Sequence, residues 1–179
     1  WLSRRAFYGS SAAALAARHP DKTAPLLISR WTLPALVLPM TGTIIGVLGG
    51  LICAGVHVRR TATALAGSGA TPAQVALLAA RGLGAGATGL SAAVCRHYWP
   101  GALVAATLSR RVRRVVAMAA VGDAVHSWVT RDRVPDEATP IGPLGYMALK
   151  RLDDLAYGAG LWMGVVRQRS LRALRPEIK

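Results

Sequence analysis

The chain has 179 residues, of which 53% are hydrophobic, with a mean hydropathy of +0.35 and a formal net charge of +14. A soluble nucleic-acid binder carries such a charge without this hydrophobicity, so we expect no nucleic-acid partner. Basic charge combined with apolar segments instead suits a protein held against the anionic lipid headgroups of a cell membrane.

Residues 1–30 predict an interfacial helix and a connector. Ala and Leu dominate the second half of residues 3–18, and His19 ends the helix because Pro20 disfavours helical geometry in the residue before it. The chain begins at Trp1 without a methionine, and its first residues resemble the end of a preceding element. We therefore expect a piece of a larger protein.

Residues 31–58 form the most apolar segment of the chain, with His57 as its one titratable polar side chain. A helix over this segment would be about 40 Å long, more than the roughly 30 Å hydrocarbon core of a bilayer. We predict one long apolar helix that spans the membrane, with Trp31 as an interfacial anchor. A bend near Pro39 or Gly49 would instead make the segment re-entrant and place every arginine cluster on one side.

Three glycines in this segment, Gly42, Gly46 and Gly50, recur at four-residue spacing. In a lipid-embedded helix, this double GxxxG pattern makes a smooth face that another backbone can approach closely. We predict a packing face here. The alternative is that glycine is simply common in a chain rich in Ala and Gly.

Residues 59–130 predict an interfacial helix followed by a short helical hairpin. Thr71 and Gln74 have the spacing of a capping box around Pro72, so a helix begins there. Arg81 lies near the middle of this helix. Since an arginine is costly at a bilayer centre, we expect the helix to be interfacial or packed on protein.

The hairpin follows from two short apolar stretches, residues 98–109 and 115–130, on either side of four arginines within residues 110–114. The arginines point all around a helix, so we expect them at the hairpin tip, on the cytoplasmic side. Asp123 lies in the second arm. We expect the neighbouring arginines to neutralise it, with His126 as an alternative partner.

Residues 131–179 predict a loop, an amphipathic helix from Leu144 and a basic tail. The adjacent carboxylates Asp153 and Asp154 lie within this helix, and Lys150 and Arg151 precede them by about one turn. We expect ion pairs here and not a catalytic or metal-binding pair.

No metal site is expected elsewhere. Cys53 with His57, and Cys95 with His97, lack flanking acids and regular ligand spacing, so we expect both cysteines to be apolar fillers. Nothing in these residues identifies a complete active site.

Three stretches of sequence carry a family resemblance: residues 8–20 (YGSSAAALAARHP), 81–86 (RGLGAG) and above all 151–176 (RLDDLAYGAGLWMGVVRQRSLRALRP). They resemble the C-terminal part of the mycofactocin-system glycosyltransferases, membrane-associated enzymes of family 2. The resemblance implies a preceding cytoplasmic catalytic domain of the GT-A type, which transfers hexose, with glucose expected, from a nucleotide-sugar to the mycofactocin precursor. It also implies a divalent metal, Mg or Mn, in that domain, and no catalytic residue or cofactor in this chain.

The resemblance further implies that the first helix closes the acceptor side of the catalytic cleft, with Arg4, Arg5, Phe7 and Tyr8 as substrate-binding residues. The QxxRW signature of processive family members is absent. Alternatively, the two arginines contact lipid phosphates and Phe7 anchors the interface.

The predicted fold is therefore all-α, with one long apolar helix, interfacial helices and a short hairpin, as the membrane-anchoring C-terminal fragment of a GT-A-type enzyme. The competing interpretation is a self-contained membrane scaffold or transport subunit without enzymatic activity.

Overall fold

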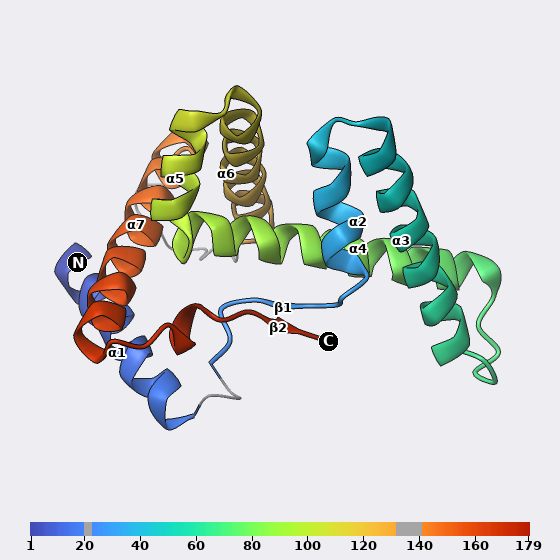
Figure 1. Cartoon of the computed structure of the whole chain (residues 1–179), viewed down its shortest axis with the longest axis horizontal. Helices are drawn as coiled ribbons and strands as arrows, with labels where there is room; N and C mark the ends of the chain where they lie inside the picture. The colour runs from blue at the N-terminus through green and yellow to red at the C-terminus, as the bar shows by residue number, and fades with distance from the viewer. Residues whose placement is uncertain (20–22, 132–140) are drawn as a thin grey trace. The chain divides into compact units, whose positions relative to one another are not determined.

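The computed structural model describes residues 1–19, 23–131 and 141–179, and these residues form seven α-helices (Figure 1). The predicted all-α class is confirmed. Contacts divide the chain into a first unit, Trp1–Leu26 with Leu90–Pro176, and a second unit, Leu27–Gly89 with Glu177–Lys179. Most of the loop predicted over 131–143 lies outside the described residues. The predicted boundaries at residues 30, 58 and 130 remain a prediction.

In the first unit, α1 (Leu2–Arg18) and α7 (Pro143–Gln168) lie side by side with their backbones in contact (Figure 1). A Cβ atom at Gly160 would overlap the Ala6 carbonyl, and one at Gly9 would overlap the Tyr157 carbonyl. A Cβ at Gly164 would lie 2.5 Å from the Ser10 carbonyl oxygen. Gly160 and Gly164 have GxxxG spacing, so this pattern brings the two helices together.

The core of the first unit lies between α1, α7 and the short 3-10 helix η3 (Arg172–Leu174). Small side chains of α1 meet larger side chains of α7 there, and Tyr98 and Trp162 pack against its edge. The buried members are Ala13, Ala16, Leu161, Val165, Ala173 and Leu174.

The predicted hairpin in the first unit consists of α5 (Trp99–Leu108) and α6 (Arg110–Thr130), joined at Ser109. The Ser109 hydroxyl accepts a hydrogen bond from the Val112 amide at 3.4 Å and so caps α6. The helix therefore begins at Arg110, and the arginines form its first turns instead of a separate tip before Val115.

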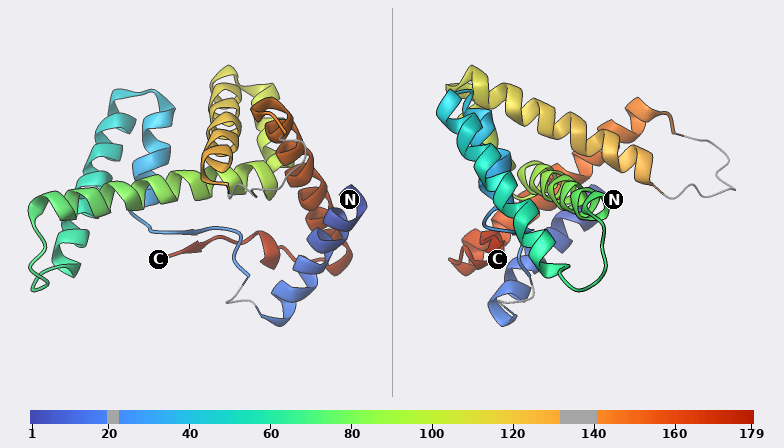
Figure 2. Two further views of the ribbon diagram at one scale, coloured as in Figure 1. Left: turned by 180° about the vertical axis from the view of Figure 1, so that it is seen from behind. Right: turned by 90° about the vertical axis from the view of Figure 1, so that its right-hand side faces the viewer.

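In the second unit, the long apolar helix expected over residues 31–58 is not continuous. The structure has α2 (Thr32–Val37), the 3-10 helix η2 (Leu38–Thr41), a turn, and then α3 (Ile44–Ala64). Gly42 has φ +64°, in the left-handed region that favours glycine. The Thr43 hydroxyl then caps α3 by accepting a hydrogen bond from the Gly46 amide at 3.0 Å. Figures 1 and 2 show that α3 returns alongside α2 as a hairpin.

Two glycines of the GxxxG pattern lie at the contact between η2 and α3 within this hairpin. A Cβ at Gly46 would lie 2.5 Å from the Leu38 carbonyl oxygen, and one at Gly50 would lie 2.5 Å from Pro39. Gly46 and Gly50 therefore let η2 lie directly on α3. Gly42 is outside α3, so the expectation of one glycine face that includes it is corrected, because this residue makes the turn.

The helix predicted from Thr71 is α4 (Pro72–Arg96), and its capping box is confirmed. The Gln74 side chain accepts from the Thr71 amide at 2.8 Å, and the Thr71 hydroxyl accepts from the Gln74 amide at 3.3 Å. By length and composition, α3 and α4 could each cross a membrane, and few of their residues are buried. These two helices suggest membrane association.

A two-stranded parallel sheet, which the sequence did not predict, closes the second unit. Strand β1 (Leu27–Ile28) pairs with β2 (Glu177–Ile178), and Leu27 lies opposite Glu177. The Arg30 amide continues the pairing by donating to the Lys179 carbonyl at 2.7 Å. The end of the described chain is thereby fixed to the segment that leads into α2.

Candidate functional site

The first unit contains a buried charge cluster built on α7. Its members come from α1, the end of α4, α6 and α7, and comprise Arg5, Arg96, Asp123, Lys150, Arg151, Asp153 and Asp154. The four cations and three carboxylates converge because one face of α7 carries both signs of charge toward the neighbouring helices.

Asp154 is the centre of the charge cluster, and its side chain is only 2% exposed. Its Oδ1 accepts from Arg96 Nε at 2.8 Å. Its Oδ2 lies 3.3 Å from Lys150 Nζ and 3.1 Å from Arg151 Nη2. The expected intrahelical ion pairs of Asp154 are therefore confirmed, and Arg96 adds a partner from α4.

Asp153 points to a different set of partners. It pairs with Arg5 of α1 and with Arg96, whose Nη2 lies 3.3 Å from its Oδ2. The hydrogen bond to Asp153 raises the pKa of the Arg5 guanidinium above its ordinary value. Both arginines also lie over the Tyr157 ring, at 5.9 Å and 5.3 Å from its centroid.

Asp123 is partnered by α7, which corrects the expectation that the arginines at the start of α6 or His126 would neutralise it. Lys150 Nζ lies 3.0 Å from Asp123 Oδ2, and Arg151 also pairs with this carboxylate. Burial acts to lower the pKa of Arg151, but the hydrogen bond to Asp123 and the nearby acidic groups raise it overall. Residues 110–114 are too far back along α6 to serve, because Asp123 lies several turns later.

The charge cluster leaves no carboxylate free to act as a base or metal ligand. Each of its carboxylates is engaged by at least two cations. In the described part of the chain, no three His, Cys, Asp or Glu side chains gather as a metal site would require. These residues therefore do not fit the divalent metal that the resemblance implies for the catalytic domain, and the cluster stabilises helix packing.

The candidate substrate-binding residues of α1 face different ways. Arg5 lies in the charge cluster, whereas Phe7 is 65% exposed, Tyr8 is 50% exposed and Arg4 is exposed beside them. The Phe7 and Tyr8 rings contact each other with centroids 6.2 Å apart. The structure thus separates Arg5, which has a packing role, from three residues that can meet another surface.

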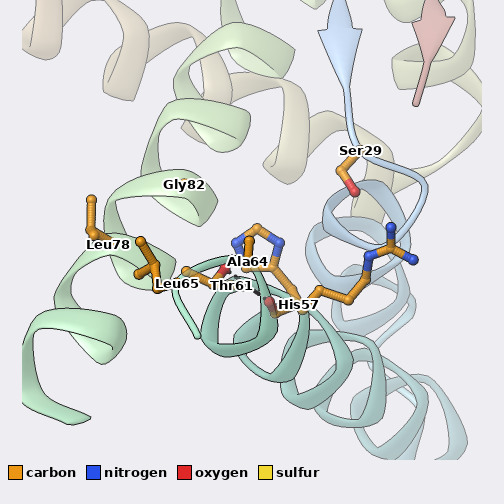
Figure 3. A pocket seen from close by; sticks show the side chains of 8 residues that line it. Ser29, His57, Thr61, Ala64, Leu65, Leu78 and Gly82 are labelled. Carbon is orange, nitrogen blue, oxygen red and sulfur yellow. Dashed lines mark hydrogen bonds between the residues drawn. The ribbon is translucent and has the colours of Figure 1, made fainter. Parts of the chain in front are cut away.

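The second unit contains an open pocket of about 530 Å³ between α3 and α4 (Figure 3). Its polar lining is Ser29, His57, Arg60 and Thr61, and its apolar walls include Leu65 and Leu78. Figure 3 shows the His57 imidazole between α3 and the turn of α4 that carries Gly82. A Cβ at Gly82 would lie 3.0 Å from His57 Nε2, so any other residue there would crowd this ring.

The hydrogen-bonding groups of this pocket are only partly used within the chain. His57 Nδ1 lies 3.4 Å from the Thr32 hydroxyl, while its Nε2 is buried without a partner. Thr61 donates to the His57 carbonyl at 3.0 Å. Arg60 is exposed, and the described residues show no carboxylate paired with it. The pocket can therefore present the Arg60 cation and the Ser29 hydroxyl, whose oxygen only accepts from the Trp31 amide, to an anionic ligand.

Two functionally placed features escaped the sequence interpretation. The GxxxG pattern of Gly160 and Gly164 joins α7 to α1, and its signal is visible in the motif GLWMG. Arg96 bridges Asp153 and Asp154 across a long sequence separation. The one sequence signal for this role is that Arg96 is a single arginine at the end of an apolar helix.

Comparison with known proteins gives two relatives, each a pre-mycofactocin glycosyltransferase of Mycobacterium tuberculosis, from strain CDC 1551 / Oshkosh and strain ATCC 25618 / H37Rv. Each is 55% identical over 180 residues, and the alignment covers 100% of this chain. The chain spans 38% of each relative, at its C-terminal end. No family model matches the chain, and no solved structure matches it significantly. The resemblance predicted from the sequence is confirmed.

Proposed function

We propose that this chain is the membrane-anchoring C-terminal region of a glycosyltransferase that acts on a mycofactocin precursor. The observation that carries the proposal is the identity of 55% over the whole chain to the C-terminal 38% of enzymes with that name. The absence of a free carboxylate in the charge cluster supports a non-catalytic role for this region. The two apolar helices α3 and α4 support the anchoring role.

In this proposal the reaction takes place outside these residues. The preceding catalytic domain, of the GT-A type and family 2, binds a nucleotide-sugar and Mg or Mn and transfers a hexose, with glucose expected. The cluster of arginines that begins α6 supports a location of that domain on the cytoplasmic side, because the cytoplasmic segments of membrane proteins carry an excess of Lys and Arg.

Three exposed residues of α1, Arg4, Phe7 and Tyr8, are proposed to face the acceptor. Substitution Phe7→Ala should raise KM for the acceptor severalfold and leave kcat nearly unchanged, since a group that binds substrate and transition state equally affects only KM. Steady-state kinetics of the full enzyme measures this. Leu15→Ala, at 50% exposure on the same helix, is the control and should leave both constants unchanged.

The anchoring role is tested by expressing the full enzyme and a form that ends before residue 1 of this chain. Membrane fractionation should find the full enzyme in the membrane and the shortened form in the soluble fraction. Residues 1–179 alone should transfer no hexose, and removal of divalent metal should stop transfer by the full enzyme. A shortened form that stays entirely in the membrane would refute the anchoring role.

A further inference from the structure

The paired part of the α2–η2–α3 hairpin, from the turn to the level of Thr32 and His57, is too short to cross a bilayer, although α3 as a whole is long enough to do so. Its base is marked by Thr32 and His57, whose side chains lie 3.4 Å apart across the two arms, and its tip is the turn at Gly42. The arm of α3 from Thr43 to His57 is about 21 Å long at the rise of an α-helix. The hydrocarbon core is about 30 Å thick, so a hairpin of this height that enters one face ends inside the bilayer.

The tip and outer faces of the hairpin are apolar and exposed. Ile44 and Ile45, directly after the turn, are 80% and 84% exposed. Further exposed apolar side chains continue along the arms, namely Val37, Met40, Leu48, Leu51 and Ile52. Within the second unit no described side chain covers them. Such a surface costs free energy in water and is stable in hydrocarbon.

The base of the hairpin has the opposite character. Arg30 precedes α2, and Arg59 and Arg60 follow His57, all three exposed. The strand pair at the base also brings the charged residues Glu177 and Lys179 to this level. Both ends of the hairpin therefore emerge at one polar level, which suits headgroups and water and not hydrocarbon.

Helix α4 meets the hairpin at its base and not along its length. Gly82 lies against His57 of α3, and one turn later Gly86 lies against Thr32 of α2. Figures 1 and 2 show α4 crossing the two arms there. Arg81 is exposed on this stretch. Because α4 crosses the base of the hairpin and carries an exposed arginine, it fits the membrane–water interface. Its length and composition would also allow it to span a membrane.

We propose that the α2–η2–α3 hairpin is a re-entrant element that enters an anionic bilayer from one face, with α4 lying along the headgroups. Charge complementarity supports the anionic bilayer as the partner, because no Asp or Glu occurs between Lys22 and Gly122. The pocket of Figure 3 then lies at headgroup level, where Arg60 meets lipid phosphates. This inference rests on the proposed anchoring role.

Labelling of the full enzyme in sealed membrane vesicles tests the topology. Cys53 and Cys95 are replaced by Ala, and single cysteines are introduced as Leu27→Cys and Ser68→Cys beyond the two base ends, and Ile44→Cys at the tip. A membrane-impermeant maleimide should label positions 27 and 68 from the same side. Position 44 should react only after detergent is added.

The outcomes separate the inference from the anchoring role. Labelling of positions 27 and 68 from opposite sides, in an enzyme that remains membrane-bound and active, would overturn the re-entrant hairpin and leave anchoring intact. Free labelling of position 44 in intact vesicles would likewise overturn it. An enzyme absent from the membrane fraction would overturn both.

A matched pair of variants tests insertion independently. Ile45→Asp places a charge at the tip and should weaken binding of the full enzyme to phosphatidylglycerol vesicles at least tenfold. Leu144→Asp, at a site of 81% exposure on α7, should bind within about twofold of the unsubstituted enzyme. Equal binding of the two variants would contradict insertion of the tip. Both should retain their far-UV circular dichroism, which shows that the helices are intact.

Discussion

At the scale of single residues, the charge cluster shows how α7 tolerates adjacent carboxylates in a helix interior. Asp154 is fully surrounded, and each of its oxygens faces at least one cation. Removing one member of such a buried group leaves the others with uncompensated charge, and this cost exceeds the net value of the intact ion pairs. The charge cluster therefore makes the packing of α7 intolerant of the loss of one charge.

Asp154→Asn should lower the free energy of unfolding by about 3–5 kcal/mol, because Arg96, Lys150 and Arg151 would lose their shared counter-ion. Glu177→Gln, which removes only an exposed pair with Lys179, should cost less than about 1 kcal/mol. Urea unfolding followed by circular dichroism measures both. Similar costs for the two variants would contradict the central role of Asp154.

His97 makes stability depend on pH. Burial lowers its pKa from 6.5 to about 4, and the charge of Arg96 acts in the same direction. Between these two pH values the unfolded chain binds a proton that the folded chain does not. The free energy of unfolding therefore rises with pH over this window, and the stability present above pH 6.5 is lost progressively as the pH falls toward about 4. His97→Gln should flatten the pH dependence of the melting temperature between pH 4.5 and 6.5, and an unchanged slope would refute the assignment.

At the scale of the helices, the contact between α1 and α7 depends on glycines that leave no space for a side chain. Gly160→Ala would push a methyl group into the Ala6 carbonyl and should destabilise the first unit by about 1–3 kcal/mol or more.

The control is Gly122→Ala in α6, where a Cβ would meet nothing within 4 Å. Alanine favours the helix there, so this variant should gain about 0.5–1 kcal/mol. Thermal unfolding of both variants measures the difference, and a stabilising effect of Gly160→Ala would show that the two backbones are not in contact.

The same elements show what sequence reasoning can reach. The capping box of Thr71 and Gln74 was predictable because its hydrogen bonds join residues three apart. A bend near Pro39 was one of two interpretations of the apolar segment, and the chain does turn just after it, at Gly42. The sequence could not choose between them, since a straight helix and a hairpin present the same apolar composition. The partners of Asp123 and the pairing of Leu27 with Glu177 were also missed, because they join residues far apart in the sequence and leave no periodic signal.

At the scale of the whole chain, the charge distribution sets the expected behaviour toward lipid. No Asp or Glu occurs between Lys22 and Gly122, so the arginines of this tract, and any histidine that gains a proton, give it only positive charge. Attraction of this tract to anionic headgroups acts over a Debye length, which shortens from about 10 Å at 0.1 M salt to about 3 Å at 1 M. The electrostatic and apolar contributions to lipid binding can therefore be distinguished by measuring binding at different salt concentrations.

Raising the salt concentration over that range should weaken binding of the full enzyme to phosphatidylglycerol vesicles severalfold but not abolish it, because apolar contacts remain. The double variant Arg59→Gln and Arg60→Gln should bind more weakly at low salt and respond less to added salt. Vesicle co-sedimentation measures this, and complete release at high salt would argue against any apolar insertion.

The pairing of β1 with β2 also has a consequence for the order of events during synthesis. The ribosome delivers Glu177–Lys179 only after the whole of α2, α3 and α4, so the hairpin emerges before the strand that secures its base exists. The apolar arms can reach lipid during this interval, while the segment around Arg30 is still untethered. Completion of the sheet then closes the loop of chain between residues 28 and 178 and, in the proposed topology, fastens the hairpin after it has entered the bilayer.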